Sequence, residues 1–131
     1  MILGLGLDIV KTSRIDAIYS KLGNNFLDRI FAKSEIDRMK YFSSNKKKLE
    51  FLSKRFAAKE AFSKALGVGI GQIKFNEIEI YNDQNGKPEI RKTAKINLLV
   101  KDLFTVKDYQ INLSITDDAG IAQAIVILSK K

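Results

Sequence analysis

The 131-residue chain contains no cysteine and no histidine. Without cysteine it can form no disulfide, no thiolate nucleophile and no zinc-finger site. Without histidine it lacks the usual general base and the usual metal ligand, and every Ser-His-Asp triad is excluded. Any catalysis by this chain must therefore rely on carboxylates, lysines, backbone dipoles or a metal ion.

Acidic residues are few relative to basic ones. There are 15 Asp and Glu against 23 Lys and Arg, which gives a net charge of +8. Such a surface attracts nucleic acid, phosphorylated small molecules, anionic membranes or an acidic protein, and charge alone does not choose among them. Since 45% of the residues are hydrophobic, we expect residues 1–131 to form one domain with its own core.

Long hydrophobic runs are also lacking. The apolar start of the chain has no basic segment before it, is interrupted by Gly4 and Gly6, and ends at Asp8. It therefore fits neither a signal peptide nor a membrane span. We expect a cytoplasmic protein that has no membrane partner.

Residues 2–10 alternate in the manner of a β-strand. One side of this strand is fully apolar and carries Leu3, Leu5, Leu7 and Ile9. The other side carries Gly4, Gly6 and Asp8, so the glycines are expected to leave empty space beside the carboxylate. That space would suit a metal ion or a phosphate. In a simpler interpretation, Asp8 only ends the strand or caps the next helix.

The 3-4 spacing of apolar residues predicts helices. We expect helical segments at residues 12–22, 26–31, 34–41, 46–66 and 94–104. Thr12 or Ser13 would cap the first of these helices, and Ser34 would cap the third. Gly23 and Gly67 would end the first and the longest helix.

Four further segments have the pattern of strands. We expect a strand over residues 73–81, a tight turn at Asn85-Gly86 and a short return strand over residues 88–90. Residues 109–116 and 121–128 would form a hairpin around a turn at residues 117–120. The sum is an α+β fold, with an antiparallel sheet packed against one long central helix plus shorter helices.

The long helix carries the most suggestive charges. Glu60 lies among apolar residues, and Lys64 follows one turn later. This pair could bind Mg²⁺ and present an ammonium to the same phosphate, or it could be an exposed ion pair of little consequence. Arg55 and Lys59 can equally be interpreted as solvated helix charges. The glycine loop at residues 67–71 is not a P-loop, and it is either a ligand contact or a simple helix stop.

Four segments together resemble one family, the holo-acyl-carrier-protein synthases, which are short, single-domain 4′-phosphopantetheinyl transferases. The segments are Gly4-Leu5-Gly6-Leu7-Asp8-Ile9-Val10, Arg55-Phe56-Ala57-Ala58-Lys59-Glu60-Ala61-Phe62-Ser63-Lys64-Ala65, Asn85-Gly86-Lys87-Pro88 and Leu113-Ser114-Ile115-Thr116-Asp117. Their order and spacing match over essentially the whole chain.

The resemblance implies an enzyme that transfers the 4′-phosphopantetheine group from coenzyme A to a serine of apo-acyl carrier protein in fatty acid biosynthesis. Adenosine 3′,5′-bisphosphate would leave. Asp8 and Glu60 would hold Mg²⁺ together with the pyrophosphate, and Lys64 would contact the phosphates, so these three residues form the expected catalytic set. With no histidine in the chain, the serine proton would pass to a water held by the metal or, through a water, to Glu60.

The resemblance also implies binding surfaces and an assembly. The adenosine 3′-phosphate end would be seated by Arg55, the glycine loop that starts at Gly67, and the turn of Asn85, Gly86, Lys87 and Pro88. The acidic carrier protein would dock on basic residues of the first helices, namely Arg14, Lys21 and Arg29. A homotrimer with active sites at its subunit interfaces is expected.

One position departs from the family pattern, because Asp117 stands where many members have histidine. Its carboxylate would repel phosphate, so we assign it no role in the site. Two alternatives remain open at this point. A basic nucleic-acid-binding module would suit the charge, but the chain lacks paired aromatics interleaved with arginine on one strand. A non-catalytic relative would bind coenzyme A without modifying a carrier.

Overall fold

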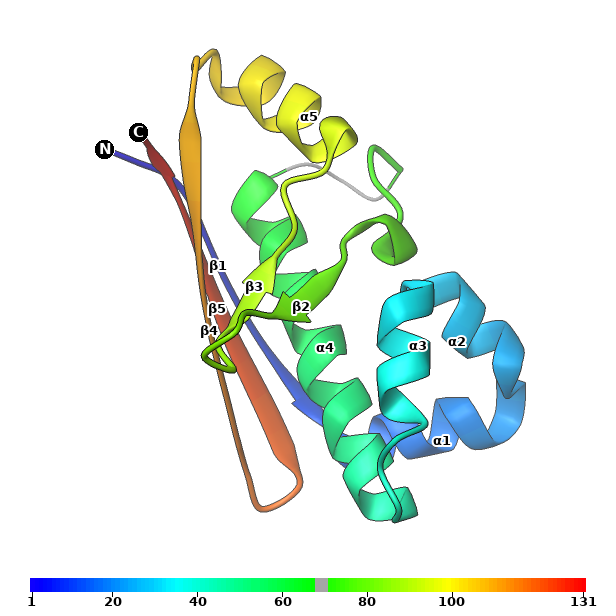
Figure 1. Cartoon of the computed structure of the whole chain (residues 1–131). Coiled ribbons are helices and arrows are strands. Elements are labelled where there is room, and N and C mark those ends of the chain that lie inside the picture. Colours follow the sequence, from blue (N-terminus) through cyan, green and yellow to red (C-terminus); the bar gives the residue numbers. More distant parts are fainter. Residues whose placement is uncertain (68–70) are drawn as a thin grey trace.

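The computed structural model describes residues 1–67 and 71–131. In chain order its elements are β1 (Ile2–Lys11), α1 (Thr12–Leu22), α2 (Asn24–Ile30), α3 (Lys33–Met39), α4 (Asn45–Leu66), the 3₁₀ helix η1 (Phe75–Glu77), β2 (Ile80–Asn82), β3 (Pro88–Ile90), α5 (Ala94–Phe104), β4 (Tyr109–Asp118) and β5 (Ile121–Lys130). The three long strands form an antiparallel sheet in the order β1-β5-β4, and β2 pairs with β3 in a small second sheet. The predicted α+β class is confirmed, and both chain ends lie at one end of the sheet (Figure 1).

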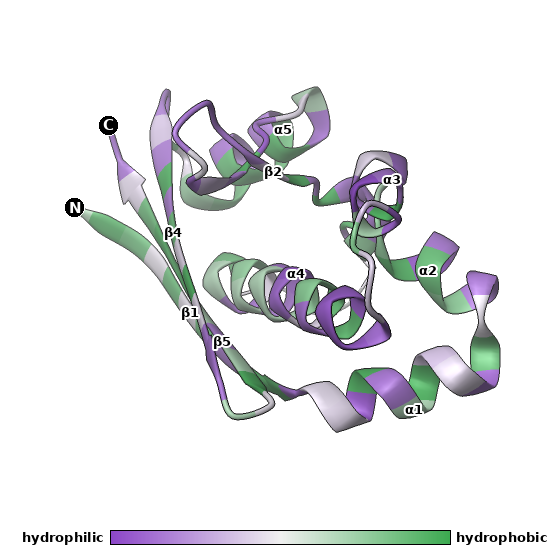
Figure 2. Ribbon diagram, turned by 60° about the horizontal axis from the view of Figure 1, so that its bottom comes forward, coloured by the Kyte–Doolittle hydropathy of each residue, from purple (hydrophilic) through white to green (hydrophobic). Residues whose placement is uncertain are grey.

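Helix α4 forms the centre of the molecule. The long sheet covers one side of it, and α1, α3, β2 and α5 surround the remaining sides (Figure 2). Its buried residues occur on every side and include Leu52, Ala57, Ala61 and Phe62. A helix that is buried all round is not amphipathic, and this explains why its apolar residues follow two neighbouring stripes and not one.

The two glycines of β1 bring the strand into direct contact with the backbone of α4. A Cβ atom built on Gly4 would lie 1.9 Å from the carbonyl oxygen of Ala65, and one on Gly6 would lie 1.8 Å from that of Ala61. The predicted empty space beside Asp8 is therefore wrong, because the helix backbone fills it. The consequence is that Asp8, two residues further along β1, lies against the side chains of α4.

The fully apolar side of β1 points away from this core. Leu5, Leu7 and Ile9 are 59%, 51% and 60% exposed in the single chain. Their partners on the neighbouring strand β5 are Ile127, Ile125 and Gln123. Two of these partners are apolar, so an apolar surface spans both strands. Alternation in a sequence defines two faces of a strand, but it does not say which face packs on the core.

The strand predicted over residues 73–81 is largely wrong. Only Ile80–Asn82 is extended and paired, and η1 occupies Phe75–Glu77. The carbonyl oxygens of Phe75 and Ile78 both accept hydrogen bonds from the ammonium of Lys59. Because these two carbonyls turn toward one buried donor, they cannot form the regular ladder of a strand.

The predicted N-terminal caps of α1 and α3 are wrong, although both helices are present and Gly23 ends α1 as expected. Helix α1 already begins at Thr12 and has no side-chain cap bond. In α3, the Ser34 hydroxyl donates to Glu79 at 2.6 Å instead of capping its own helix. The capping role belongs to Glu35, whose Oε1 accepts from the backbone N–H of Ala32 at 2.8 Å.

The β4–β5 hairpin is tighter than expected, since both strands run on to leave only Ala119 and Gly120 between them. Its tip contacts the start of α1, where the N–H of Thr12 donates to the carbonyl of Gly120 at 2.8 Å. Among the helices of the described residues, none has the length and apolar character needed to cross a membrane.

Candidate active site

The end of β1 and the last turns of α4 bring together two residues that are distant in sequence. Lys64 Nζ lies 3.0 Å from Asp8 Oδ1 and also donates to the carbonyl oxygen of Leu7 at 3.1 Å. The Asp8 side chain is 15% exposed, whereas that of Lys64 is 55% exposed. The sequence predicted this pairing of the opening strand with the central helix, and the close approach at Gly6 makes it possible.

Glu60 lies one helical turn before Lys64, on the same face of α4. Burial raises the pKa of Glu60, and the negative charge of Asp8 raises it further, while Lys64 and Arg14 act in the opposite direction. The carboxylate of Asp8 therefore lies close enough to Glu60 to disfavour its ionised form. Two carboxylates and two cations therefore share a small region at the end of β1.

This donor set suits a hard divalent cation. Carboxylate oxygens are ligands for Mg²⁺, which is commonly held by one or two carboxylates together with substrate phosphates and waters. Residues 1–67 and 71–131 contain no group of three or more His, Cys, Asp or Glu residues that could hold a metal by themselves. Asp8 and Glu60 could thus hold such an ion only if oxygens from a ligand or water complete its coordination.

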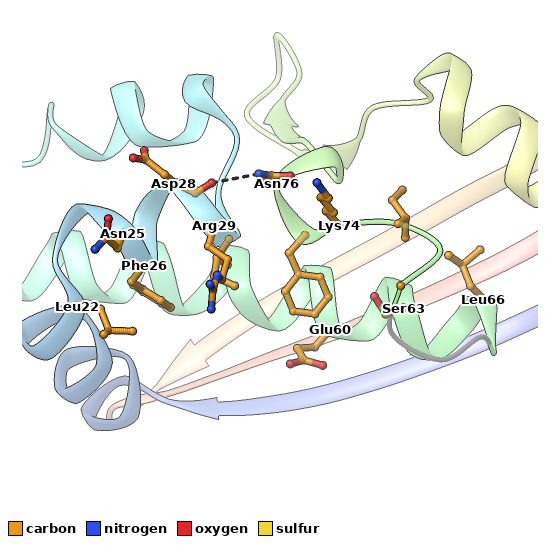
Figure 3. Close-up of a pocket in the computed structure, with 14 residues that line it drawn as sticks. Leu22, Asn25, Phe26, Asp28, Arg29, Glu60, Ser63, Leu66, Lys74 and Asn76 are labelled. Atoms are coloured by element: carbon orange, nitrogen blue, oxygen red, sulfur yellow. Dashed lines mark hydrogen bonds between the residues drawn. The ribbon is translucent and has the colours of Figure 1, made fainter.

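A cavity of about 910 Å³ opens beside Glu60. Figure 3 shows its walls, with Leu22 from α1, Phe26 and Arg29 from α2, and Ser63 from α4. Seven of its 14 lining residues are polar or charged, but most of its lining surface is apolar, as in many small-molecule sites. Across the cavity from Glu60, the side-chain amide of Asn76 donates to the carbonyl of Asp28 at 3.1 Å and joins two of these walls.

The three basic residues predicted to bind a partner lie on the first two helices, and all are exposed. Arg14 stands near Glu60, and its guanidinium lies 5.7 Å from the ring centre of Phe56. Arg29 lines the cavity itself, and Lys21 is in the last turn of α1. The structure therefore brings Arg14 and Arg29 to the region of Glu60, with Lys21 at the far end of α1.

Arg55 is linked to the Asn85–Pro88 turn, but only through another residue. Its Nη2 lies 2.5 Å from Asn82 Oδ1, and the amide of Asn82 in turn donates to the carbonyl of Gly86 at 2.9 Å. Arg55 is only 4% exposed. Asn82 was not predicted, because nothing in its local pattern distinguishes it from the other asparagines of the chain.

The turn itself is confirmed. Gly86 has a φ of +84°, and Asp83 Oδ1 accepts from the N–H groups of Asn85 and Lys87, both at 2.9 Å. Pro88 opens β3, where its missing N–H is tolerated. The tip leaves Lys87 exposed to solvent. Gly67 ends α4 in the left-handed conformation as expected, whereas residues 68–70 of the predicted glycine loop lie outside the described residues.

The predicted site residues form two groups on opposite sides of α4. Arg55 and Lys64 are separated by nine positions, which corresponds to about 180° around a helix. Asp8, Glu60 and Lys64 lie on one side. Arg55 and the turn at residues 85–88 lie on the other, and within one chain the two groups do not meet.

A buried charged cluster on the second side of α4 was not predicted. Lys59 is 0% exposed, and its ammonium lies 2.6 Å from Oε1 of the equally buried Glu35. Burial lowers the pKa of Lys59 and Glu35 opposes this effect, while burial lowers the pKa of Arg55 to about 10. The interpretation of Arg55 and Lys59 as solvated charges is therefore wrong. Leu52 and Phe62 lie on the same stripe of the helix as Arg55 and Lys59. This apolar spacing was the signal in the sequence that both charges could be buried.

The position that departs from the family pattern, Asp117, is exposed near the end of the β4–β5 hairpin. It pairs with Ala122 across the ladder. Within the described residues no hydrogen bond or ion pair links Asp117 to Asp8 or Glu60, and we leave it outside the candidate site.

Known proteins resemble this chain in sequence and in fold. The family model described as the 4′-phosphopantetheinyl transferase superfamily matches residues 4–117. A holo-[acyl-carrier-protein] synthase of Wolbachia pipientis is 44% identical over 129 residues, which cover 98% of each chain. The crystal structure of the holo-[acyl-carrier-protein] synthase from Neisseria meningitidis has a TM-score of 0.87 and 34% identity, over 99% of this chain and 100% of that one.

A further solved structure contains a ligand. It is a holo-(acyl-carrier-protein) synthase from Bacillus anthracis in complex with CoA (3′,5′-ADP), with a TM-score of 0.80 and 34% identity over 100% of this chain and 99% of that one. These matches confirm the resemblance drawn from the four sequence motifs and the class of enzyme expected from it.

Proposed function

The chain belongs to the 4′-phosphopantetheinyl transferase superfamily, and from this premise we propose that it transfers the 4′-phosphopantetheine arm of coenzyme A to a serine of an apo-acyl carrier protein. We further propose that the reaction depends on Mg²⁺ and serves fatty acid biosynthesis in the cytoplasm. One observation carries the proposal: Asp8, Glu60 and Lys64 come together beside a cavity, from two elements whose contact two glycines permit.

Asp8 and Glu60 are the residues that would hold Mg²⁺. When bound there, the ion would supply a Lewis acid and a template for the pyrophosphate. Lys64 supplies a mobile positive charge in the same place, because its side chain is half exposed and ends in three donors. As a bond to phosphorus breaks, this ammonium can stabilise the negative charge that grows on the departing nucleotide.

The proposed step exchanges the phosphoanhydride bond of the coenzyme's pyrophosphate for a phosphoester bond to serine. The serine oxygen of the carrier attacks the β-phosphorus, the bond from that phosphorus to the bridging oxygen breaks, and adenosine 3′,5′-bisphosphate leaves with the electron pair. The serine proton must go to a base. In this histidine-free chain we propose that Glu60 receives it through a water.

We propose that each active site is shared between neighbouring copies of a homotrimer. The support is twofold. Arg55 and the 85–88 turn face away from Asp8 and Glu60 within one chain, so a coenzyme that used both groups would have to bridge two copies. In addition, Leu5, Leu7 and Ile9 form an exposed apolar face on the side of β1 opposite Asp8, of a kind that marks protein interfaces.

The carrier protein is proposed to dock beside the cavity on Arg14, Arg29 and, at the far end of α1, Lys21. An acidic partner suits these exposed cations and the net charge of +8. The apolar cavity next to Glu60 suits the uncharged pantetheine arm, which would leave its phosphate at the carboxylates.

The test is an intact-mass measurement. The purified chain is incubated with an acidic apo-carrier protein, coenzyme A and Mg²⁺, and the carrier is expected to gain one phosphopantetheine arm. Asp8→Ala and Glu60→Gln should abolish the gain, and chelation of the metal should do the same. A carrier whose mass is unchanged by the wild-type chain would refute the proposed transfer, and coenzyme A binding without transfer would identify a non-catalytic relative.

A further inference from the structure

The ion pair between Lys64 and Asp8 has a consequence for metal binding. We propose that Lys64 is a resident counter-ion of the metal site: its ammonium competes with the divalent cation for Asp8, and the pyrophosphate of coenzyme A draws it away. Metal and coenzyme would then bind cooperatively. This inference rests on the proposed function, since it assigns the metal to Asp8 and Glu60.

The first step is geometric. Lys64 Nζ is 3.0 Å from Asp8 Oδ1 and 3.1 Å from the carbonyl of Leu7, so two of its three donors are directed at the end of β1. A divalent ion coordinated to the same carboxylate would lie within a few ångströms of this ammonium and be repelled by it. Two cations would thus share one carboxylate, and the binding of either would weaken that of the other.

The second step concerns mobility. The Lys64 side chain is 55% exposed, whereas the Asp8 side chain is 15% exposed. Exposed ion pairs are weak, and a lysine ends in a compact charge on a flexible stem, so an anion near α4 can capture this ammonium. Asp8 has no such freedom, because β1 is fixed against the backbone of α4 at Gly4 and Gly6.

The third step is thermodynamic. A phosphate group that attracts Lys64 removes a competitor from Asp8 and also supplies oxygens for the metal. By linkage, a coenzyme that strengthens metal binding must be bound more strongly, by the same factor, when the metal is present. Lys64 would transmit part of this coupling as a positioning residue, in addition to its contact with the phosphates.

The experiment measures Mn²⁺ affinity by calorimetry on the full chain without coenzyme A. Lys64→Gln removes the competitor and is expected to bind Mn²⁺ about three- to tenfold more tightly than wild type. Lys64→Arg keeps a cation at Asp8 and should bind Mn²⁺ like wild type. Arg14→Gln is the matched control, because it removes the same charge near Glu60 without contact to Asp8, and its affinity should rise no more than about twofold.

The second arm repeats the titrations with coenzyme A present. Wild type should bind Mn²⁺ more tightly with the coenzyme than without it, and this enhancement should shrink in Lys64→Gln. An unchanged or weaker Mn²⁺ affinity in Lys64→Gln would overturn the inference, as would equal gains in Lys64→Gln and Arg14→Gln, which would indicate only a general charge effect. Absence of Mn²⁺ binding in every variant would overturn it as well.

Failure of this inference is distinguishable from failure of the proposed function. A wild-type chain that modifies the carrier, together with a Lys64→Gln variant that gains no Mn²⁺ affinity, leaves the function intact and removes the competition. A Lys64→Gln variant that gains affinity, together with a wild-type chain that modifies no carrier, gives the opposite result. Thermal melting of each variant checks that the exposed substitution leaves the fold unchanged.

Discussion

The contact between β1 and α4 predicts that Gly6→Ala is severely disruptive. The added Cβ would lie 1.8 Å from the carbonyl oxygen of Ala61 and 2.8 Å from the backbone nitrogen of Ala65, whereas ordinary contacts begin at 3.4 Å. Neither neighbour is a flexible side chain, so the strand must retreat by about 1.6 Å, the difference between 3.4 and 1.8 Å. Overpacking against a fixed backbone costs about 3 kcal/mol, and the lower entropy of the unfolded alanine chain offsets at most about 1 kcal/mol.

A net loss of about 2–3 kcal/mol corresponds to a fall in melting temperature of roughly 10 °C for a domain of this size. The assay is thermal melting followed by circular dichroism. Gly23→Ala is the matched control, because Gly23 has open space around it and only a positive φ of +59° to strain the substitution. That strain costs about 1 kcal/mol. A Gly6→Ala variant that melts within about 3 °C of Gly23→Ala would refute the tight contact, since 1 kcal/mol shifts the melting temperature of such a domain by roughly 4 °C.

The same variant tests the link from packing to catalysis. Retreat of β1 carries Asp8 away from Lys64 and Glu60, and misplacement of a catalytic group by about 1 Å can lower a rate about 100-fold. The transfer rate of the folded fraction is therefore expected to fall by about two orders of magnitude. Normal transfer by a folded Gly6→Ala chain would mean that Asp8 does not depend on this contact.

Four further predictions concern single side chains. The pKa of Glu60 is raised in the folded chain, so its ionisation lowers the stability as the pH rises above 4.5. Glu60→Gln should therefore melt at a higher temperature than wild type near neutral pH and lose this gain below pH 4.5. The same variant should transfer no phosphopantetheine. If the proposed trimer forms, Leu7→Asp should reduce the mass seen by light scattering from three times 14.8 kDa to 14.8 kDa, whereas Leu98→Asp, at a still more exposed leucine on α5, should leave the mass unchanged. Arg14→Glu should raise KM for the carrier about tenfold while KM for coenzyme A stays the same; equal effects on both would contradict docking at this residue. Asn82→Ala should raise KM for coenzyme A with little effect on kcat, because it disconnects the 85–88 turn from α4.

Much of the fold was predictable because local periodicity and packing agree. Helix α5 was predicted with its observed bounds, and the hairpin of β4 and β5 was predicted with only its turn too long. Periodicity failed where a distant group overrides the local pattern. Residues 73–79 read as a strand, but a buried ammonium from α4 takes two of their carbonyls, and no local window contains that information.

The candidate site was predictable from residue types, and its physical basis was not. Asp8, Glu60 and Lys64 were identified together, and their proximity was expected. The reason given for the glycines was wrong, since Gly4 and Gly6 accommodate a helix and not a ligand. A glycine in a sequence indicates only that another group can approach the backbone closely at that position. Whether the neighbour is backbone, metal or phosphate depends on residues far along the chain.

The buried ammonium of Lys59 also determines how the molecule can open. It holds Glu35 of α3 and the carbonyls of Phe75 and Ile78, so one charge fastens three stretches of chain that are far apart in sequence. Helix α3 has only seven residues and would fray readily alone. Detachment of α3 from α4 would leave the buried ammonium of Lys59 without its carboxylate partner. The amide hydrogens of α3 should consequently exchange with solvent at the pace of global unfolding, as part of one cooperative unit with α4.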